Sequence, residues 1–201
     1  MTNFRDGTRP KSGSRSRGLL VSDFVLCDLH PRKFLERVRQ SRDAYDGFNL
    51  LVAADGELLH YANVRDDVTT VTPGVHGLSN HLLNTPWPKV QRGKAALQGL
   101  VAGPPEVLTA GLLDALGDTR GATEEELPRT GVSLEWERQL ARIFIHAPGY
   151  GTRASTVVLS ERFGNLAFIE RNFAPDAQPI ETRTLQFSRV PSGAASAWTF
   201  A

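Results

Sequence analysis

Hydrophobic residues recur along the first part of the chain at intervals of three and four positions. This spacing is typical of a helix that turns one apolar face toward a core, and it predicts a helix over about residues 17–28. Pro31 suits the first turn of a second helix, in which Phe34, Leu35 and Val38 share one face and basic residues occupy the other. The chain therefore begins, after a short strand-like segment, with two helices.

A different pattern, rich in apolar and β-branched residues, follows these helices. Residues 48–53 and 58–63 flank an Asp-Gly pair, which is a strong signal for a β-hairpin. Residues 68–71 are all β-branched and predict a third strand, and residues 75–79 are expected to form a fourth. The first half of the chain thus predicts antiparallel strands beside its helices.

The second half of the chain also groups its elements, with helices before strands. The expected elements are helices at residues 87–101, 106–116 and 134–140, a hairpin at 156–159 and 166–171, and a last strand at 184–187. Because strands and helices form blocks and do not alternate singly, the pattern favours an α+β fold with antiparallel sheets. We expect one domain over residues 1–188 and a flexible tail at residues 189–201.

Composition and charge narrow the class of protein. The chain has 201 residues, of which 40% are hydrophobic and 22% charged, values that indicate a globular protein. A formal net charge of +1 gives no overall attraction to nucleic acid, and no apolar run reaches the length of a transmembrane helix. The N-terminus lacks the hydrophobic segment of a secretory signal, so we expect a cytoplasmic protein. The sequence does not indicate an oligomeric state.

The cysteine and histidine residues do not form a recognisable metal site. Cys27 is the only cysteine, which excludes an intrachain disulfide, and it shares a helical face with Leu20 and Phe24 as a buried thiol would. His76 and His81 are five positions apart, which places them on opposite faces of an extended segment. The sequence also has no P-loop, dinucleotide fingerprint, nucleophile elbow or attachment motif for covalent haem. We therefore predict no metal site and no covalent cofactor.

Two polar segments lie where strands begin or end, and each has two interpretations. Asn80 follows the expected strand at residues 75–79, where its amide is suited to stabilise a developing oxyanion or simply to cap a turn. Arg153 lies beside small residues at the start of a strand, where its guanidinium is suited to bind a ligand carboxylate or to pair with Glu170. The residues alone do not decide between these alternatives.

Several segments, taken in order, resemble the NRDE family, also called the transport and Golgi organisation family. The most specific are GLSN at residues 77–80, TPWPK at residues 85–89 and YGTRAST at residues 150–156. The others are residues 2–6, 45–51, 135–138, 144–145 and 170–173. The resemblance extends from residue 2 to about residue 188.

The resemblance implies a fold similar to that of the N-terminal-nucleophile hydrolases, an αββα sandwich of two antiparallel sheets between helical layers. It also implies haem trafficking, as a haem chaperone or a related handler of a small-molecule ligand. Haem would be a transported, non-covalent ligand, with an axial contact from His76, His81 or Tyr150 and with Arg153 beside a propionate. The residues expected to line the ligand site are Asn3, Arg5, His76, Ser79, Asn80, Tyr150 and Arg153.

The chain departs from the family pattern at its start. Family members carry a cysteine after the initiator methionine and then an Asn-Arg-Asp-Glu motif, whereas Met1 here stands where a later family segment begins. We therefore expect an N-terminally truncated domain that lacks its first strands and its nucleophile. The alternative function is a cysteine amidohydrolase in which Asn80 serves the oxyanion and Arg153 orders the nucleophile region; it is expected to be inactive in this chain, with no catalytic residue. A third interpretation, a membrane-traffic interaction protein, has no residue that marks it.

Overall fold

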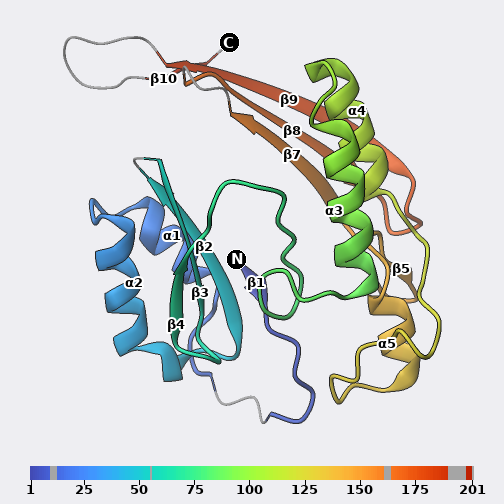
Figure 1. Ribbon diagram of the computed structural model, residues 1–201, viewed down its shortest axis with the longest axis horizontal. Helices are drawn as coiled ribbons and strands as arrows, with labels where there is room; N and C mark the ends of the chain where they lie inside the picture. Colours follow the sequence, from blue (N-terminus) through green and yellow to red (C-terminus); the bar gives the residue numbers. More distant parts are fainter. Residues whose placement is uncertain (10–12, 55, 161–163, 190–197, 201) are drawn as a thin grey trace. The chain divides into compact units, whose positions relative to one another are not determined.

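A computed structural model describes residues 1–9, 13–54, 56–160, 164–189 and 198–200 of the chain (Figure 1). The chain divides into two compact units. Unit 1 contains Met1–Lys94 and Glu125–Glu137, and unit 2 contains Ala95–Glu124 and Arg138–Ala201. The organisation as one domain over residues 1–188 stays a prediction.

Unit 1 is built on a four-stranded antiparallel sheet in the order β1-β2-β3-β4. Its strands are β1 (Thr2–Asn3), β2 (Phe48–Ala54), β3 (Glu57–Ala62) and β4 (Asp67–Thr70), and its helices are α1 (Leu19–Val25), α2 (Pro31–Gln40) and the short 3-10 helix η1 (Arg42–Ala44). β2 and β3 form the predicted hairpin, in which Asn49 is opposite Ala62. Gly56 at the turn has a φ of +79°, a conformation that glycine adopts without steric cost. The other turn residue of the predicted pair, Asp55, lies outside the described residues.

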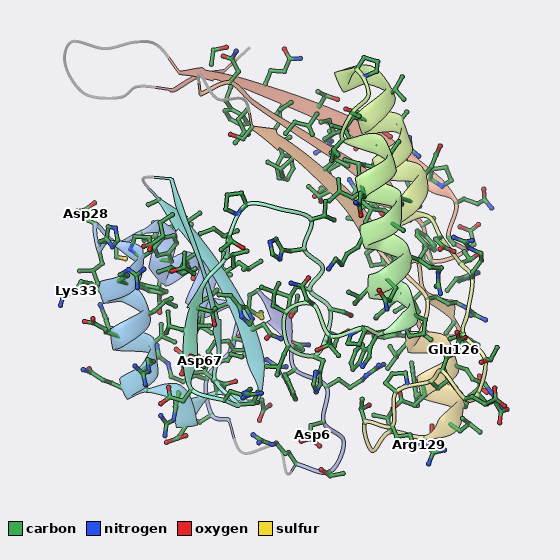
Figure 2. All side chains as sticks on the ribbon, in the orientation of Figure 1. Asp6, Asp28, Lys33, Asp67, Glu126 and Arg129 are labelled. Carbon is green, nitrogen blue, oxygen red and sulfur yellow. The ribbon has the colours of Figure 1, made fainter. Side chains whose placement is uncertain are left out.

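One face of the unit 1 sheet packs against α2, as the apolar spacing predicted. Pro31 occupies the first turn of α2 and His30 caps it through Nδ1, so the helix begins where the sequence indicated. Phe34 and Leu35 are 3% and 0% exposed and belong to one cluster with apolar residues of β2 and β3. Burial of each such side chain stabilises the fold by about 1.5–3 kcal/mol. Figure 2 shows Lys33 on the opposite, exposed side of the helix.

α1 adds to this core through the face that was predicted from the sequence. Leu20 is buried, and the rings of Phe24 and Phe34 lie 5.0 Å apart between their centroids. Cys27 follows the end of α1, packs against the same cluster and donates its thiol to the Phe24 carbonyl oxygen at 3.4 Å. The predicted thiol is therefore part of the core, although it is partly and not fully buried.

The prediction of a fourth strand at residues 75–79 is wrong, because they form an irregular segment of the loop from β4 to α3. We call residues 71–87 the β4–α3 loop. The Gly77 amide donates to Asn84 Oδ1 at 3.0 Å, and the Asn84 amide donates to the Gly77 carbonyl oxygen at 2.8 Å. Asn84 has a φ of +60°, a left-handed conformation that asparagine tolerates. Contacts within the loop thus satisfy backbone groups that a strand would have paired.

Unit 2 contains a second four-stranded antiparallel sheet, in the order β10-β9-β8-β7, and a separate hairpin of β5 and β6. The strands are β5 (His146–Ala147), β6 (Tyr150–Gly151), β7 (Ala154–Ser160), β8 (Leu166–Phe173), β9 (Pro179–Arg189) and β10 (Trp198–Phe200). The helices are α3 (Pro88–Leu100), α4 (Pro105–Leu116) and α5 (Leu134–Leu140), of which α3 and α5 cross the boundary between the units. β10 lies in the expected tail and was not predicted; residues 190–197 lie outside the described residues.

α4 covers one face of the unit 2 sheet (Figure 1). Leu113 of α4, Val157 of β7 and Ile169 of β8 are 6%, 4% and 6% exposed and form one apolar cluster. A Cβ atom built at Gly111 would lie 2.5 Å from the Leu100 side chain, so glycine permits α4 to approach α3 closely.

The structure keeps helices and antiparallel sheets in separate blocks along the chain, which confirms the α+β prediction. α3 spans 13 residues, fewer than the roughly 20 that cross a bilayer. Within the described residues, no helix combines the length and the apolar character of a membrane span.

Candidate functional site

The β4–α3 loop follows the outer edge of β1 and brings four of the predicted site residues together. Thr2 Oγ1 donates to the Ser79 carbonyl oxygen at 2.7 Å, and Asn80 Nδ2 donates to the Asn3 carbonyl oxygen at 3.1 Å. The Arg5 amide donates to the Asn80 carbonyl oxygen at 2.6 Å. Asn80 therefore fixes the loop to the N-terminal segment through both its backbone and its side chain.

A buried amide holds the same loop from inside unit 1. Asn49 is 0% exposed, and its Nδ2 donates to the His81 carbonyl oxygen at 3.0 Å. Its Oδ1 lies 3.0 Å from Nε2 of His60, and burial lowers the pKa of His60, so the imidazole is neutral at pH 7 and suited to donate from Nε2. Sequence reasoning missed Asn49; its one signal was an asparagine in an otherwise apolar strand.

Arg5 lies inside unit 1 beside a carboxylate and an indole ring. Its guanidinium nitrogen is 3.4 Å from Glu137 Oε2, and the two side chains are 9% and 5% exposed. The guanidinium carbon lies 4.5 Å from the centroid of the Trp87 ring, within the range of a cation–π contact. Glu137 Oε1 accepts hydrogen bonds of 2.7 Å from the amide and the hydroxyl of Thr130. The ion pair and the two hydrogen bonds thus fix the position of the buried Glu137 side chain.

Lys89 places a second cation at the same ring. Its Nζ lies 6.0 Å from the centroid of the Trp87 ring. Burial, and then the nearby charge of Arg5, lower the pKa of Lys89 to about 8, while Glu137 acts in the opposite direction. Lys89 therefore stays mostly protonated at pH 7, and two cations share the neighbourhood of one carboxylate.

His81 completes this group with a neutral ring. Its centroid lies 4.8 Å from that of Phe4 and 5.5 Å from that of Trp87, and Nδ1 is 2.8 Å from the Thr85 hydroxyl. Burial, together with the charge of Arg5, lowers the pKa of His81. A neutral imidazole is the form that binds a metal. His81 thus has the protonation state that an axial ligand needs.

We call this group the Trp87 cluster. Its members are Arg5, His81, Trp87, Lys89 and Glu137, all of which belong to unit 1. The sequence pointed to Arg5 and His81, but the burial of Glu137 and the position of Lys89 depend on contacts between residues far apart in the chain. In the described part of the chain, no three His, Cys, Asp or Glu side chains gather as metal ligands.

His76, a predicted axial contact, is hydrogen-bonded within the β4–α3 loop. Its Nε2 lies 2.8 Å from the Thr72 carbonyl oxygen, and its Nδ1 lies 2.8 Å from Asn84 Nδ2. Both ring nitrogens therefore have partners within the loop. An axial contact from His76 would require one of these hydrogen bonds to break.

Tyr150 and Arg153 belong to unit 2, whereas the other predicted site residues belong to unit 1. They line a cavity of about 180 Å³ beside the β5–β6 hairpin, and Tyr150 is 52% exposed. Arg153 is exposed, and among the described residues no ion pair joins it to Glu170. The Glu170 carboxylate instead accepts a hydrogen bond of 3.1 Å from the Thr156 hydroxyl. Of the two interpretations of Arg153, the ion pair with Glu170 is therefore not formed in the described part of the structure.

Comparison with known proteins places this arrangement in a family. The family model described as Transport and Golgi organisation 2 matches residues 1–175. The human Transport and Golgi organization protein 2 homolog is 35% identical over 193 residues, which cover 87% of this chain and 68% of that protein. The mouse Transport and Golgi organization 2 homolog is 31% identical over 206 residues, covering 94% of this chain and 73% of that protein. The match includes β1, the β4–α3 loop and α5, and the chain belongs to the Transport and Golgi organisation 2 family.

Proposed function

We propose that this chain handles an anionic, aromatic small molecule in the cytoplasm, with haem as the first candidate, and that the Trp87 cluster binds it. One observation carries the proposal: Arg5 and Lys89 place two cations at one indole ring, and the single carboxylate of Glu137 pairs with Arg5 and acts on Lys89. Cations held out of water favour an anionic partner more strongly than cations on the surface do. The word transport in the names of the relatives agrees with a carried ligand.

The chemistry of haem matches these groups. Haem is flat and aromatic, and it carries two carboxylates. The cluster combines the aromatic rings of Phe4, His81 and Trp87, a chemistry suited to a flat aromatic ligand, with the cations of Arg5 and Lys89, a chemistry suited to carboxylates. The neutral ring of His81 is bonded through Nδ1, which leaves Nε2 as the nitrogen for an axial contact. Held in this way, haem would exchange without a covalent bond to the chain.

Two finer predictions belong to this proposal. The αββα sandwich is supported by the sheets themselves, since each has one face covered by helices and one face with exposed apolar side chains. These include Leu51 and Leu58 in unit 1, both 37% exposed, and Val158 and Leu185 in unit 2, 53% and 48% exposed. Exposed apolar faces are typical of surfaces that bind another apolar surface. The amidohydrolase alternative has less support, because the amide of Asn80 donates to a backbone carbonyl oxygen.

A haemin titration tests the proposed ligand. The full chain should give a saturable Soret shift. His81→Phe keeps a ring between Phe4 and Trp87 but removes the axial nitrogen, so the position of the Soret band should change. Lys89→Gln should weaken binding by about threefold to tenfold through the loss of one charged partner.

The matched control is His146→Phe, because His146 is exposed and lies in unit 2. It should leave both the spectrum and the affinity unchanged. The absence of a Soret shift in the unmodified chain would contradict the proposal, and so would an equal effect of His81→Phe and His146→Phe.

A further inference from the structure

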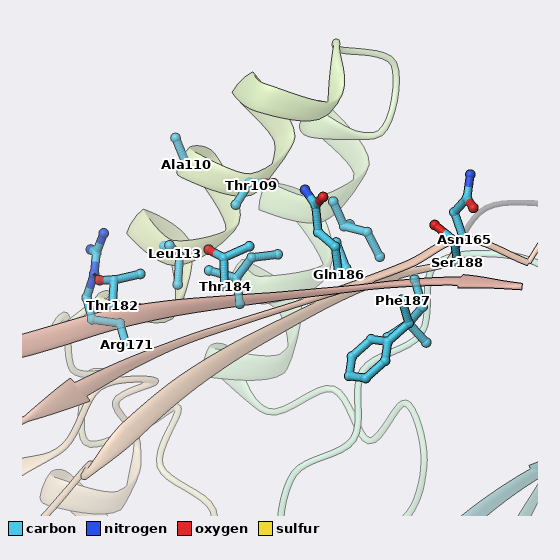
Figure 3. Close-up of a pocket in the computed structure, with 14 residues that line it drawn as sticks. Thr109, Ala110, Leu113, Asn165, Arg171, Thr182, Thr184, Gln186, Phe187 and Ser188 are labelled. Carbon is cyan, nitrogen blue, oxygen red and sulfur yellow. Dashed lines mark hydrogen bonds between the residues drawn. The ribbon is translucent and has the colours of Figure 1, made fainter. Parts of the chain in front are cut away.

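Unit 2 contains a cavity that the proposed function does not use. It has a volume of about 670 Å³ and lies between α4 and the strands β7, β8 and β9 (Figure 3). Sites for small molecules usually measure about 300–1,000 Å³. The cavity therefore has the size of a binding site for one small molecule.

One side of the cavity is apolar. Leu113 of α4 and Ile169 of β8 line it and are both 6% exposed, and Leu159 and Ala167 extend the same surface along β7 and β8. Figure 3 shows Leu113 pointing from the helix toward the sheet. This side offers a ligand a hydrocarbon surface that is largely formed in advance.

The other side of the cavity is polar and exposed. Thr182, Thr184 and Gln186 occupy alternate positions of β9, so their side chains lie on the same face of the sheet. In Figure 3 Thr184 and Gln186 point toward α4. Their hydroxyl and amide groups form a polar row parallel to the apolar surface.

Arg171 supplies a single charge at one end of this row. Its Nε donates to the Thr182 hydroxyl at 3.2 Å. Arg171 is the one charged residue among the described residues that line the cavity, and within that part of the chain it has no ion pair. Glu170 and Arg183 are paired with each other in the sheet register and lie on the opposite face. A guanidinium in this position is suited to a bidentate contact with a carboxylate.

The dimensions of the cavity follow from the strand that forms its polar side. From Thr182 to Ser188 the strand advances six residues, which corresponds to roughly 20 Å. Arg171 lies at the Thr182 end of this segment. A ligand that fills the cavity and pairs with Arg171 therefore carries its carboxylate at one end of the molecule.

We propose that this cavity binds a facially amphipathic monocarboxylate, a rigid molecule with hydroxyl or amide groups along one edge, hydrocarbon along the other and a terminal carboxylate. The carboxylate pairs with Arg171, the polar edge faces Thr182, Thr184 and Gln186, and the hydrocarbon edge faces Leu113 and Ile169. A simple fatty acid fits less well, since it would cover hydroxyl and amide groups with hydrocarbon and give them no hydrogen-bond partner.

Isothermal titration of the full chain with cholate, below its micelle concentration, tests the proposal. Cholate has hydroxyl groups on one face, an apolar opposite face and a terminal carboxylate. The expected result is saturable binding at one site. Arg171→Gln should weaken it by about tenfold or more, because the charged partner of the carboxylate is lost. Thr184→Val, which keeps the shape but removes a hydroxyl, should weaken it by about threefold.

Arg183→Gln is the matched control, because Arg183 is a neighbouring arginine whose side chain pairs with Glu181 on the other face of the sheet. It should leave cholate binding unchanged. Dodecanoate should bind more weakly than cholate and should not respond to Thr184→Val.

Three results would overturn the proposal: cholate binding that does not saturate, equal losses for Arg171→Gln and Arg183→Gln, or tighter binding of dodecanoate than of cholate. The haemin spectrum should be the same in Arg171→Gln as in the unmodified chain, because the Trp87 cluster is in unit 1. The failure of one proposal can therefore be distinguished from the failure of the other.

Discussion

The two sheets of this protein differ in how completely helices cover them. In unit 1, ten buried residues of α1, α2, β2, β3 and the adjoining turn form one cluster, whereas the corresponding cluster beneath α4 in unit 2 contains three, counted over the described residues. The strand β9 of the unit 2 sheet carries exposed threonines and a glutamine where a second helix would require apolar residues. Unit 1 thus uses its helix-covered face for stability, and unit 2 keeps part of that face accessible to a ligand.

The largest expected effect is on the free energy of unfolding, when one buried side chain in each unit is truncated to alanine. Phe48→Ala removes a ring that is 0% exposed and has edge contacts with Tyr45 and Tyr61, so the free energy of unfolding of unit 1 should fall by about 3–5 kcal/mol. Leu113→Ala should lower that of unit 2 by about 2–3 kcal/mol, since its position beside an open cavity gives neighbouring groups room to relax. Urea unfolding followed by segment-resolved hydrogen exchange measures both. Equal losses in the two units would contradict the comparison.

A smaller effect is expected where unit 1 holds the β4–α3 loop. Asn49→Ala removes the donor to the His81 carbonyl oxygen and leaves His60 Nε2 without its acceptor, at a cost of about 2–3 kcal/mol. Hydrogen exchange should accelerate across residues 79–85 more than across α2. Exchange that increases equally in both segments would show that Asn49 supports unit 1 as a whole and does not fix the loop in particular.

The smallest effect concerns pH and Lys89. The unfolded lysine keeps its proton up to about pH 10.5, whereas the folded one releases it near pH 8. The unfolded state therefore binds more protons in this interval, and the free energy of unfolding should rise by about 2 kcal/mol between pH 8 and pH 10. Lys89→Met should abolish this rise. A rise that persists in the variant would assign it to another group.

Sequence patterns correctly predicted the helices and turns that depend on interactions between neighbouring residues. The α2 face followed from apolar spacing and Pro31, and the β2–β3 turn from an Asp-Gly pair that suits a left-handed backbone. The resemblance likewise pointed to Arg5 and Asn80, which are in contact in the structure. In each case the decisive information lies within a few neighbouring residues or within a short motif.

Predictions failed where long-range contacts decide the structure. Residues 75–79 have the composition of a strand, but Asn84 of the same loop bonds to Gly77, and Thr2, 77 positions away in the sequence, bonds to Ser79. Glu137 looked like any acidic residue of an amphipathic helix, yet it is 4% exposed and contacts Arg5, 132 positions away in the sequence. The cavity beside Arg171 depends on which strand α4 leaves uncovered, and no local pattern encodes that choice.

Unit 1 is not complete when the ribosome has added Lys94, because residues 125–137 also belong to it. The Gly7 amide donates to the Thr130 carbonyl oxygen at 2.6 Å, and Arg5 pairs with Glu137. Roughly 40 further residues must be added first, which takes about 2–9 s at the usual rates of synthesis. Translation speed across residues 95–137 therefore sets how long the nascent segment at residues 1–94 remains accessible to proteases and chaperones.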